Sequence, residues 1–185
     1  MKILIIIGSP KKHSFNYLFS QYAYQYLKKY CEVSYLDYHD LPYISSDNQY
    51  DFIETVERIK KEIEQADGLW IFASEYNLSY CAQLKNLLDW LSVPIQDHDF
   101  DQGTFIKGKK VTITSVAGTT GGRFVLTKLY ELLNFIGMDL MKDDSTGVAL
   151  LKEDFKEDIP HFTVEDFNHL YRQCDSFICY IKGSL

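Results

Sequence analysis

The feature that most constrains the fold of this chain is the alternation of short apolar runs with longer segments of helical period. Residues 2–7 form an apolar run rich in isoleucine, a pattern typical of a strand buried on both faces of a sheet. Similar runs predict strands at 32–36, 68–73 and 111–117, with a short fifth strand at 138–141. Apolar residues at helical spacing predict helices at 15–30, 52–66, 84–91, 126–136 and 163–181.

Strands that alternate with helices are joined by right-handed crossovers, so the strands run parallel and helices cover both faces of the sheet. We therefore expect an α/β protein with a five-stranded parallel sheet between two layers of helices, in a single domain spanning 1–185. Thr163 and Asp166 have the spacing of a capping box, which predicts where the last helix begins. The acidic stretch 92–103 is predicted to be a surface loop, and 143–162 shows no legible pattern.

Composition limits the classes of function. The formal net charge of −7 disfavours non-specific binding to nucleic acid or to an anionic membrane. The four cysteines lack CxxC spacing, and together with the five scattered histidines they give no metal signature. No apolar stretch has the length of a membrane span, and the N-terminal run lacks a signal-peptide cleavage site. We therefore expect a cytoplasmic protein with free thiols, no metal, and no membrane or nucleic-acid partner.

Candidate binding residues lie in the turns that follow three of the predicted strands. In a doubly wound parallel sheet, ligands bind outside the carboxyl ends of the strands. The first turn, 8–16, carries Ser9, Ser14, Asn16 and two lysines at the start of a helix, which suits a phosphate monoester. It has neither the triphosphate P-loop sequence nor the Gly-x-Gly-x-x-Gly fingerprint of dinucleotide sites. The alternative is a helix capped by Ser14 with solvated lysines.

The other two turns each allow a ligand-binding and a purely structural interpretation. In 74–79, Tyr76 could stack on a planar ring beside two polar neighbours, or the turn could be a connector ending in the helix cap Ser79. In 115–123, three glycines allow close backbone approach to a ligand, or they form a flexible loop with Thr120 as the next cap.

No catalytic side chain is predicted. Local spacing gives no Ser-His-Asp or Cys-His arrangement, and His13 is interpreted as a solvated loop residue. Cys81 lies near a predicted helix start, where the pKa of a thiol can fall, but an inert helix residue is the preferred interpretation.

The second turn and the helix after it resemble a known family. Glu75-Tyr76-Asn77, Leu84-Lys85-Asn86 and Asp89-Trp90 are similar to the E-Y-N…L-K-N…D-W signature of the NADPH-dependent FMN reductase family. These flavodoxin-like proteins include azo, quinone and chromate reductases. The resemblance extends from the Gly8-Ser9 loop to the Gly121-Gly122 turn, and it implies a flavodoxin-like three-layer sandwich.

The resemblance implies that FMN is the cofactor and NAD(P)H the co-substrate. Hydride would pass from the nicotinamide through bound FMN to a quinone, azo, flavin or similar small electrophile at one shared site. The residues that the family pattern assigns to FMN lie in the three turns: Ser9, Lys11, Ser14, Phe15 and Asn16 at the phosphate and ribityl chain, Glu75, Tyr76 and Asn77 at the ring, and Ser115, Gly118, Gly121 and Gly122 at its other edge.

The resemblance also suggests supporting roles and an assembly. Lys85 and Asn86 would support the second loop, and Asp89-Trp90 would lie in packing or in a subunit contact. Family members are commonly dimers or tetramers, so a homodimer or homotetramer is implied. The segment 93–105 could form part of a subunit contact, a substrate lid or a plain solvent-facing loop.

The chain departs from the family pattern at three places. Ser74 replaces a proline, Cys81-Ala82 replaces Pro-Gly, and a lysine in the phosphate loop replaces arginine. Loss of the proline predicts a looser turn, and lysine cannot hold a phosphate with two parallel hydrogen bonds. Two alternatives with the same fold stay open: a non-enzymatic flavin-binding electron carrier and a flavin-free regulatory protein.

Overall fold

The computed structural model describes residues 1–96 and 99–183. Its main sheet is parallel, with the strand order β2-β1-β3-β6-β7, and β8 also pairs with β6. The order reverses between β1 and β3, which is where such sheets bind ligands. The predicted α/β fold with a parallel sheet is confirmed. The strands are β1 (Lys2–Gly8), β2 (Glu32–Tyr35), β3 (Gly68–Ala73), β6 (Lys110–Ala117), β7 (Asp139–Leu140) and β8 (Thr146–Ala149).

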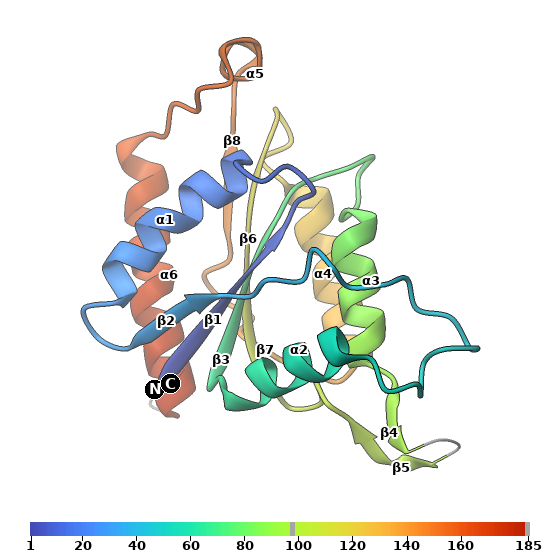
Figure 1. Cartoon of the computed structure of the whole chain (residues 1–185). Helices are drawn as coiled ribbons and strands as arrows, with labels where there is room; N and C mark the ends of the chain where they lie inside the picture. The colour runs from blue at the N-terminus through green and yellow to red at the C-terminus, as the bar shows by residue number, and fades with distance from the viewer. Residues whose placement is uncertain (97–98, 184–185) are drawn as a thin grey trace.

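Helices cover both faces of the sheet, as Figure 1 shows. One layer contains α1 (Phe15–Leu27) and α6 (Val164–Lys182). The other layer contains α2 (Glu54–Gln65), α3 (Ala82–Leu91) and α4 (Arg123–Phe135). The three-layer sandwich is therefore present as predicted.

Two hydrophobic cores form because successive side chains of a strand point to opposite faces. Ile3 and Ile5 of β1 belong to the core shared with α1 and α6, whereas Leu4 and Ile6 belong to the core on the opposite face. The capping box of Thr163 begins α6 as predicted, because its hydroxyl accepts from the Asp166 amide while the Asp166 carboxylate accepts from the Thr163 amide.

The fifth position of the sheet differs in detail from the expectation. The prediction was one strand at 138–141, whereas β7 pairs with the start of β6 and β8 pairs with its end. Between them, Asp144 has a left-handed backbone with φ +64°. Its carboxylate accepts hydrogen bonds from Arg172 and Ser176 of α6, at 2.7 Å each. These bonds draw the chain toward α6, so the edge of the sheet is built from two short strands.

The segment 92–103 is a hairpin, so its prediction as an irregular surface loop was wrong. Strands β4 (Pro94–Gln96) and β5 (Asp99–Thr104) pair antiparallel, and residues 97–98 between them lie outside the described range. The hairpin lies at the end of the sheet opposite the loops after β1, β3 and β6 (Figure 1). That position contradicts the idea of a lid over the chain's own loops. In the part of the chain that the structure describes, no helix has the length and apolar character needed to cross a membrane.

Candidate functional site

A cavity of about 320 Å³ opens where the loops after β1, β3 and β6 meet. It lies at the carboxyl ends of the strands, on both sides of the β1–β3 reversal, as the sequence predicted. Its lining includes most of the residues expected to bind a cofactor; the lining residues are Ser9, Lys11, Ser14, Phe15, Asn16, Ser74, Glu75, Tyr76, Val116, Ala117, Gly118, Phe155 and Asp158.

One end of this cavity is formed by the start of α1. Ser14 is the N-cap, and its hydroxyl oxygen accepts from the Tyr17 amide at 3.2 Å, so its own O–H remains a donor. The first amides of a helix have no partner within it, which leaves those of Phe15 and Asn16 available to an anion. The side chain of Lys11 lies over the Phe15 ring, 5.5 Å from its centroid. This end therefore offers hydroxyl, amide and ammonium donors together.

Asn16 is a scaffold residue of this site as well as part of its lining. Its side chain is 1% exposed and makes two hydrogen bonds to the backbone of Val116, one to the amide and one to the carbonyl, each 2.8 Å long. Its amide group also donates to the hydroxyl of Ser74 at 3.0 Å. Asn16 thus joins the start of α1 to the ends of β3 and β6, and its side-chain oxygen and nitrogen both have protein partners.

Ser74 makes hydrogen bonds that a proline could not make. Its backbone N–H donates to the carbonyl of Gly8 at 3.0 Å, and its hydroxyl is the acceptor for Asn16. Proline has no N–H and no hydroxyl. The turn is therefore held by specific bonds, and the looser turn predicted from the missing proline does not describe it.

Glu75 connects the second loop to the third. One carboxylate oxygen accepts from the Thr120 hydroxyl at 2.7 Å, and the other accepts from the amides of Phe124 and Val125 at 3.1 Å each. The N-cap of α4 is Gly122, which has no side chain to fill this role. Glu75 therefore supplies the negative charge that favours a helix N-terminus, and holds two walls of the cavity together.

The residues after Glu75 form a tight turn. The backbones of Tyr76 and Ser79 exchange two hydrogen bonds of 2.7 and 2.9 Å, and Asn77 and Leu78 between them have φ of +49° and +65°. Two consecutive left-handed residues define a type I′ turn. The turn leaves the Tyr76 ring 45% exposed at the cavity, while Asn77 is not among the described lining residues.

Ser115, Gly121 and Gly122 also lie outside the described lining, although Gly118 is part of it. Ser115 is fully buried, and its hydroxyl donates to the carbonyl of Ala73 at 2.7 Å. Gly122 has φ +74°, and a Cβ there would lie 2.2 Å from the Ser115 oxygen. Ser115 and Gly122 therefore support the third loop through this hydrogen bond and this close packing.

Two lining residues come from α5 (Lys152–Glu157) and its C-cap, inside the segment that showed no pattern. Phe155 packs edge-on against Phe15, with ring centroids 5.3 Å apart. Asp158 forms an ion pair with Lys11. We call residues 150–162 the strap. Sequence reasoning missed it because a six-residue helix gives too little periodicity to read.

The strap is anchored by the carboxylate of Asp154. This buried side chain accepts hydrogen bonds from the Leu151 amide, the His161 amide and the His161 ring, at 2.7, 3.1 and 2.6 Å. The hydrogen bond from the His161 side chain is the main cause that holds the pKa of Asp154 below its usual range, and the backbone amides add to it.

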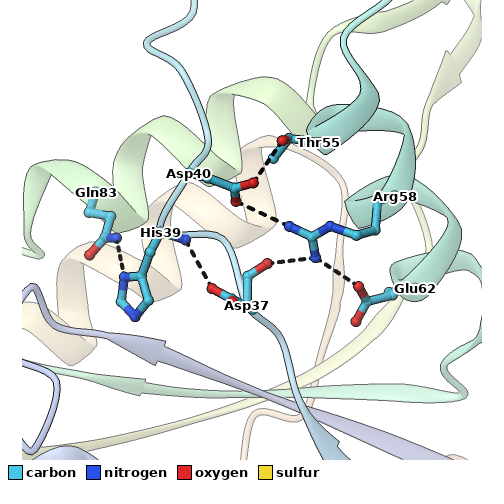
Figure 2. Close-up of polar contacts among 7 residues, drawn as sticks. All are labelled: Asp37, His39, Asp40, Thr55, Arg58, Glu62 and Gln83. Atoms are coloured by element: carbon cyan, nitrogen blue, oxygen red, sulfur yellow. Dashed lines mark hydrogen bonds and ion pairs between the residues drawn. The ribbon is translucent and has the colours of Figure 1, made fainter.

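A second cavity of about 250 Å³ lies on the other side of the first loop and shares Ser9 and Lys11 with the first. One wall is formed by residues 37–39 of the segment 37–40 that follows β2. Figure 2 shows how Arg58 of α2 holds this segment, through the Asp37 carbonyl at 2.9 Å and the Asp40 carboxylate at 3.1 Å.

The same segment is tied to neighbouring helices at two more points (Figure 2). The Thr55 hydroxyl donates to Asp40 at 2.8 Å, and this bond is the main cause that lowers the pKa of Asp40. The ring of His39 is 2.9 Å from the Gln83 amide of α3. The first loop is therefore flanked by a cavity on each side, and each cavity has a wall held by hydrogen bonds.

Two family-signature residues of α3, Asn86 and Trp90, form hydrogen bonds with the segment after β2. The resemblance had implied that Asn86 supports the second loop. Asn86 accepts from the Ile44 amide at 2.9 Å and donates to the Pro42 carbonyl at 2.8 Å, and Trp90 donates to the same carbonyl at 2.8 Å. The implied role of Asn86 in supporting the second loop is therefore wrong, because its side chain faces the segment after β2. Trp90 is buried, in agreement with a packing role.

The remaining α3 residues have local roles. Lys85 forms an ion pair with Asp89 one turn later, and not with the second loop. Cys81 is buried at the N-cap of α3. Burial raises the pKa of its thiol, although the amides of Leu84 and Gln83 favour the thiolate. The burial and the raised pKa of the thiol favour the predicted unreactive residue, although Cys81 is the N-cap of α3 and does not lie within the helix.

The chain is similar to characterised reductases in sequence. A model of the family described as NADPH-dependent FMN reductase matches residues 1–150. The chain is 34% identical over 146 residues to a quinone reductase of Escherichia coli K12, covering 76% of this chain and 73% of that protein. It is 36% identical over 94 residues to a 2-hydroxy-1,4-benzoquinone reductase of a Burkholderia species, a match that spans about half (51%) of either protein.

The fold is also similar to that of solved structures. FerB, a flavoenzyme NAD(P)H:(acceptor) oxidoreductase from Paracoccus denitrificans, superposes with a TM-score of 0.83 over 99% of this chain and 98% of its own, at 24% identity. At that identity the likeness supports the flavodoxin-like fold alone. The family match, in contrast, includes all three loops that surround the cavity. The chain therefore belongs to the NADPH-dependent FMN reductase family, oxidoreductases that use FMN with NAD(P)H as the electron donor.

Proposed function

We propose that this chain binds FMN in the cavity at the carboxyl ends of β1, β3 and β6, and reduces a quinone or similar small electrophile with NAD(P)H. The observation that supports this most is that the first loop, the Glu75-Tyr76 turn and Gly118 line one cavity, although they are far apart in the sequence. The cavity volume of about 320 Å³ lies within the range of roughly 300–1,000 Å³ typical of small-molecule sites.

The residues at the two ends of the cavity fit the two ends of FMN. A phosphate suits the start of α1, where Ser9, Ser14 and Lys11 gather beside free helix amides. A planar ring suits the walls formed by the second and third loops, where Tyr76 is exposed and Gly118 allows close backbone approach. A lysine, backbone amides and hydroxyls thus take the place of the arginine that the family commonly has in this loop.

When bound, FMN supplies the acceptance and donation of hydride, and the protein supplies position and electrostatics. Glu75 holds the second and third loops at a set separation, and Asn16 holds both to α1. The described lining contains no histidine or cysteine. One carboxylate oxygen of Glu75 accepts from the Thr120 hydroxyl, and the other accepts from two amides of α4. We assign no dedicated acid or base among the described lining residues, in which Asp158 is paired with Lys11, so we expect a broad range of small electrophiles.

Anaerobic titration tests this proposal. The purified protein, loaded with FMN, is mixed with NADPH or NADH, and the flavin absorbance and then the oxidation by menadione are followed. We expect bleaching of the flavin by the reduced nicotinamide and its recovery with menadione. FMN that binds without being bleached would indicate an electron carrier. Failure to bind FMN in equilibrium dialysis would indicate a flavin-free regulatory protein.

We also propose that the chain acts as one domain, in a homodimer or homotetramer, in the cytoplasm. The resemblance to the family supports this assembly, and the β4–β5 hairpin offers a protruding segment for a subunit contact (Figure 1). Light scattering coupled to size-exclusion chromatography tests it, and a monomer at micromolar concentration would contradict it.

A further inference from the structure

We propose that Asp158 competes with the phosphate of FMN for Lys11, and thereby lowers the preference of the site for FMN over riboflavin. The inference rests on the proposed function, because it concerns the cavity assigned to the flavin. It adds a specificity-determining residue from the strap, a part of the chain to which the family signature assigns no role.

Lys11 and Asp158 both belong to the lining of the same cavity, and they form an ion pair with each other. Lys11 is the cation at the end of the cavity that suits a phosphate, beside Ser14 and the start of α1. The carboxylate of Asp158 therefore binds the group that a phosphate would need, and it carries the same sign of charge as the phosphate.

The strap, and not Lys11 alone, determines where this carboxylate lies. Phe155 packs against Phe15 and lies close to Gly118, with 3.9 Å from its ring to the position of a Cβ on that glycine. Asp154 anchors both ends of the strap through Leu151 and His161. Asp158 should therefore stay near the phosphate end even when Lys11 turns toward a ligand.

The ion pair is weak enough to be displaced. The side chain of Lys11 is 52% exposed and that of Asp158 is 62% exposed, and exposed pairs of this kind contribute little and are screened by salt. A phosphate ester carries a charge of about −1.5 to −2 at neutral pH, so it outcompetes a single carboxylate. The affinity for FMN is therefore lowered in two ways: Asp158 must be displaced from Lys11, and its carboxylate then remains near the phosphate. Riboflavin has no phosphate, and its affinity is not lowered in this way.

The backbone at Asp158 indicates which variant to use. Its φ is +54°, in the left-handed region, which asparagine and glycine tolerate well. Asp158→Asn removes the charge with almost no change in shape, and Asp158→Gly is a second variant should the first fold poorly. Glu157→Gln is the matched control, because Glu157 is an exposed carboxylate next in the chain that is not part of the described cavity lining.

The experiment measures dissociation constants of FMN and riboflavin by quenching of flavin fluorescence, for the full chain and each variant. At low ionic strength we expect Asp158→Asn to bind FMN about three- to fivefold more tightly, and riboflavin with less than a twofold change. At about 0.5 M salt the gain in FMN affinity should be smaller, because salt screens the interactions between these exposed charges. In a Lys11→Gln background the gain should be smaller, because the contested cation is gone and only the repulsion between Asp158 and the phosphate remains.

Four outcomes would overturn the inference: unchanged FMN affinity in both Asp158 variants, an equal gain for riboflavin, an equal gain in Glu157→Gln, or an undiminished gain in the Lys11→Gln background. Failure of the proposed function is distinct from these. A wild-type chain that binds neither flavin would refute the FMN site itself, and the inference with it, whereas FMN binding without an effect of Asp158 refutes the inference alone.

Discussion

The two ends of the cavity are held together by different kinds of interaction. Around the loops after β3 and β6, buried groups make neutral and charge-assisted hydrogen bonds: Asn16 of α1 bonds to Val116, and Glu75 bonds to the start of α4. At the start of α1, the strap closes on the first loop through an exposed ion pair of Lys11 and an aromatic contact of Phe155.

The comparison separates a rigid end from an adaptable one. A buried polar group left without its partner costs about 1–3 kcal/mol, whereas an exposed ion pair contributes about 0–1 kcal/mol. The walls expected to hold a flavin ring are therefore preorganised. The Lys11–Asp158 ion pair at the phosphate end can be displaced at low cost, which is useful where a charged ligand must enter.

The largest effect is expected from removing Asn16, whose buried hydrogen bonds join α1 to the loops after β3 and β6. Asn16→Ala leaves the amide and the carbonyl of Val116 without these partners, and we expect a loss of about 2–4 kcal/mol in the free energy of unfolding. Urea denaturation measures it. Asn134→Ala is the control, because Asn134 makes an exposed hydrogen bond to the Tyr130 carbonyl. Equal losses in the two variants would contradict the distinction between a buried scaffold and a surface contact.

A second prediction uses two glycines with the same backbone conformation. Gly108 and Gly122 both have φ +74°, but a Cβ at Gly108 meets no atom within 4 Å, whereas one at Gly122 lies 2.2 Å from the Ser115 oxygen. We expect Gly108→Ala to cost about 1 kcal/mol from backbone strain alone. Gly122→Ala should cost at least about 1 kcal/mol more in thermal or urea unfolding. If the two variants were equally stable, the third loop would not be packed against Ser115 as described.

A third prediction concerns acid and the strap. The pKa of Asp154 is lowered, chiefly by the His161 hydrogen bond, so in the folded state the carboxylate loses its charge at a lower pH than in the unfolded state. Its contribution to stability is present above the ordinary carboxyl range, and is lost as pH falls through the folded pKa, below about pH 4.

The amide resonances of residues 151–161 should therefore shift or broaden in acid before those of the buried strands. In Asp154→Asn the strap should be loosened at neutral pH already and insensitive to acid in that range. Retention of the wild-type acid response in Asp154→Asn would show that another group controls the strap.

The smallest effect on stability is expected at the adaptable end. Lys11→Gln removes the exposed ion pair with Asp158, and we expect a loss of at most about 0.5 kcal/mol, which disappears in 0.5 M salt. Chemical denaturation at two salt concentrations measures it. A loss of more than about 2 kcal/mol would mean that this ion pair stabilises the fold as much as the buried hydrogen bonds of Asn16 do.

Much of the fold could be predicted because it depends on local pattern. The apolar runs, the helical spacing and the Thr163 capping box each predicted an element that is present. The β4–β5 hairpin and α5 were missed, because short polar elements with few apolar residues produce no periodicity.

The position of the candidate site was predicted correctly, but several of its residues have roles other than those predicted. The three loops do converge, but Asn77, Ser115, Gly121 and Gly122 are not among the described lining residues, and Phe155 and Asp158 enter from the strap. Ser74 shows the limit of argument from a missing proline, since its hydrogen bonds to Gly8 and Asn16 depend on where those residues lie.

The sequence by itself determined the parallel α/β architecture, the loops in which a ligand would bind and, through Glu75-Tyr76-Asn77 and the helix after it, the family. Those properties follow from residues that are neighbours in the chain. Only the tertiary structure decided which side chains face the cavity and which support it. The deciding contacts join residues 100 positions apart, as for Asn16 and Val116, or 147 apart, as for Lys11 and Asp158. Such pairs form only when the helices and loops pack on the sheet, and a pattern of neighbouring residues does not predict which distant residues meet.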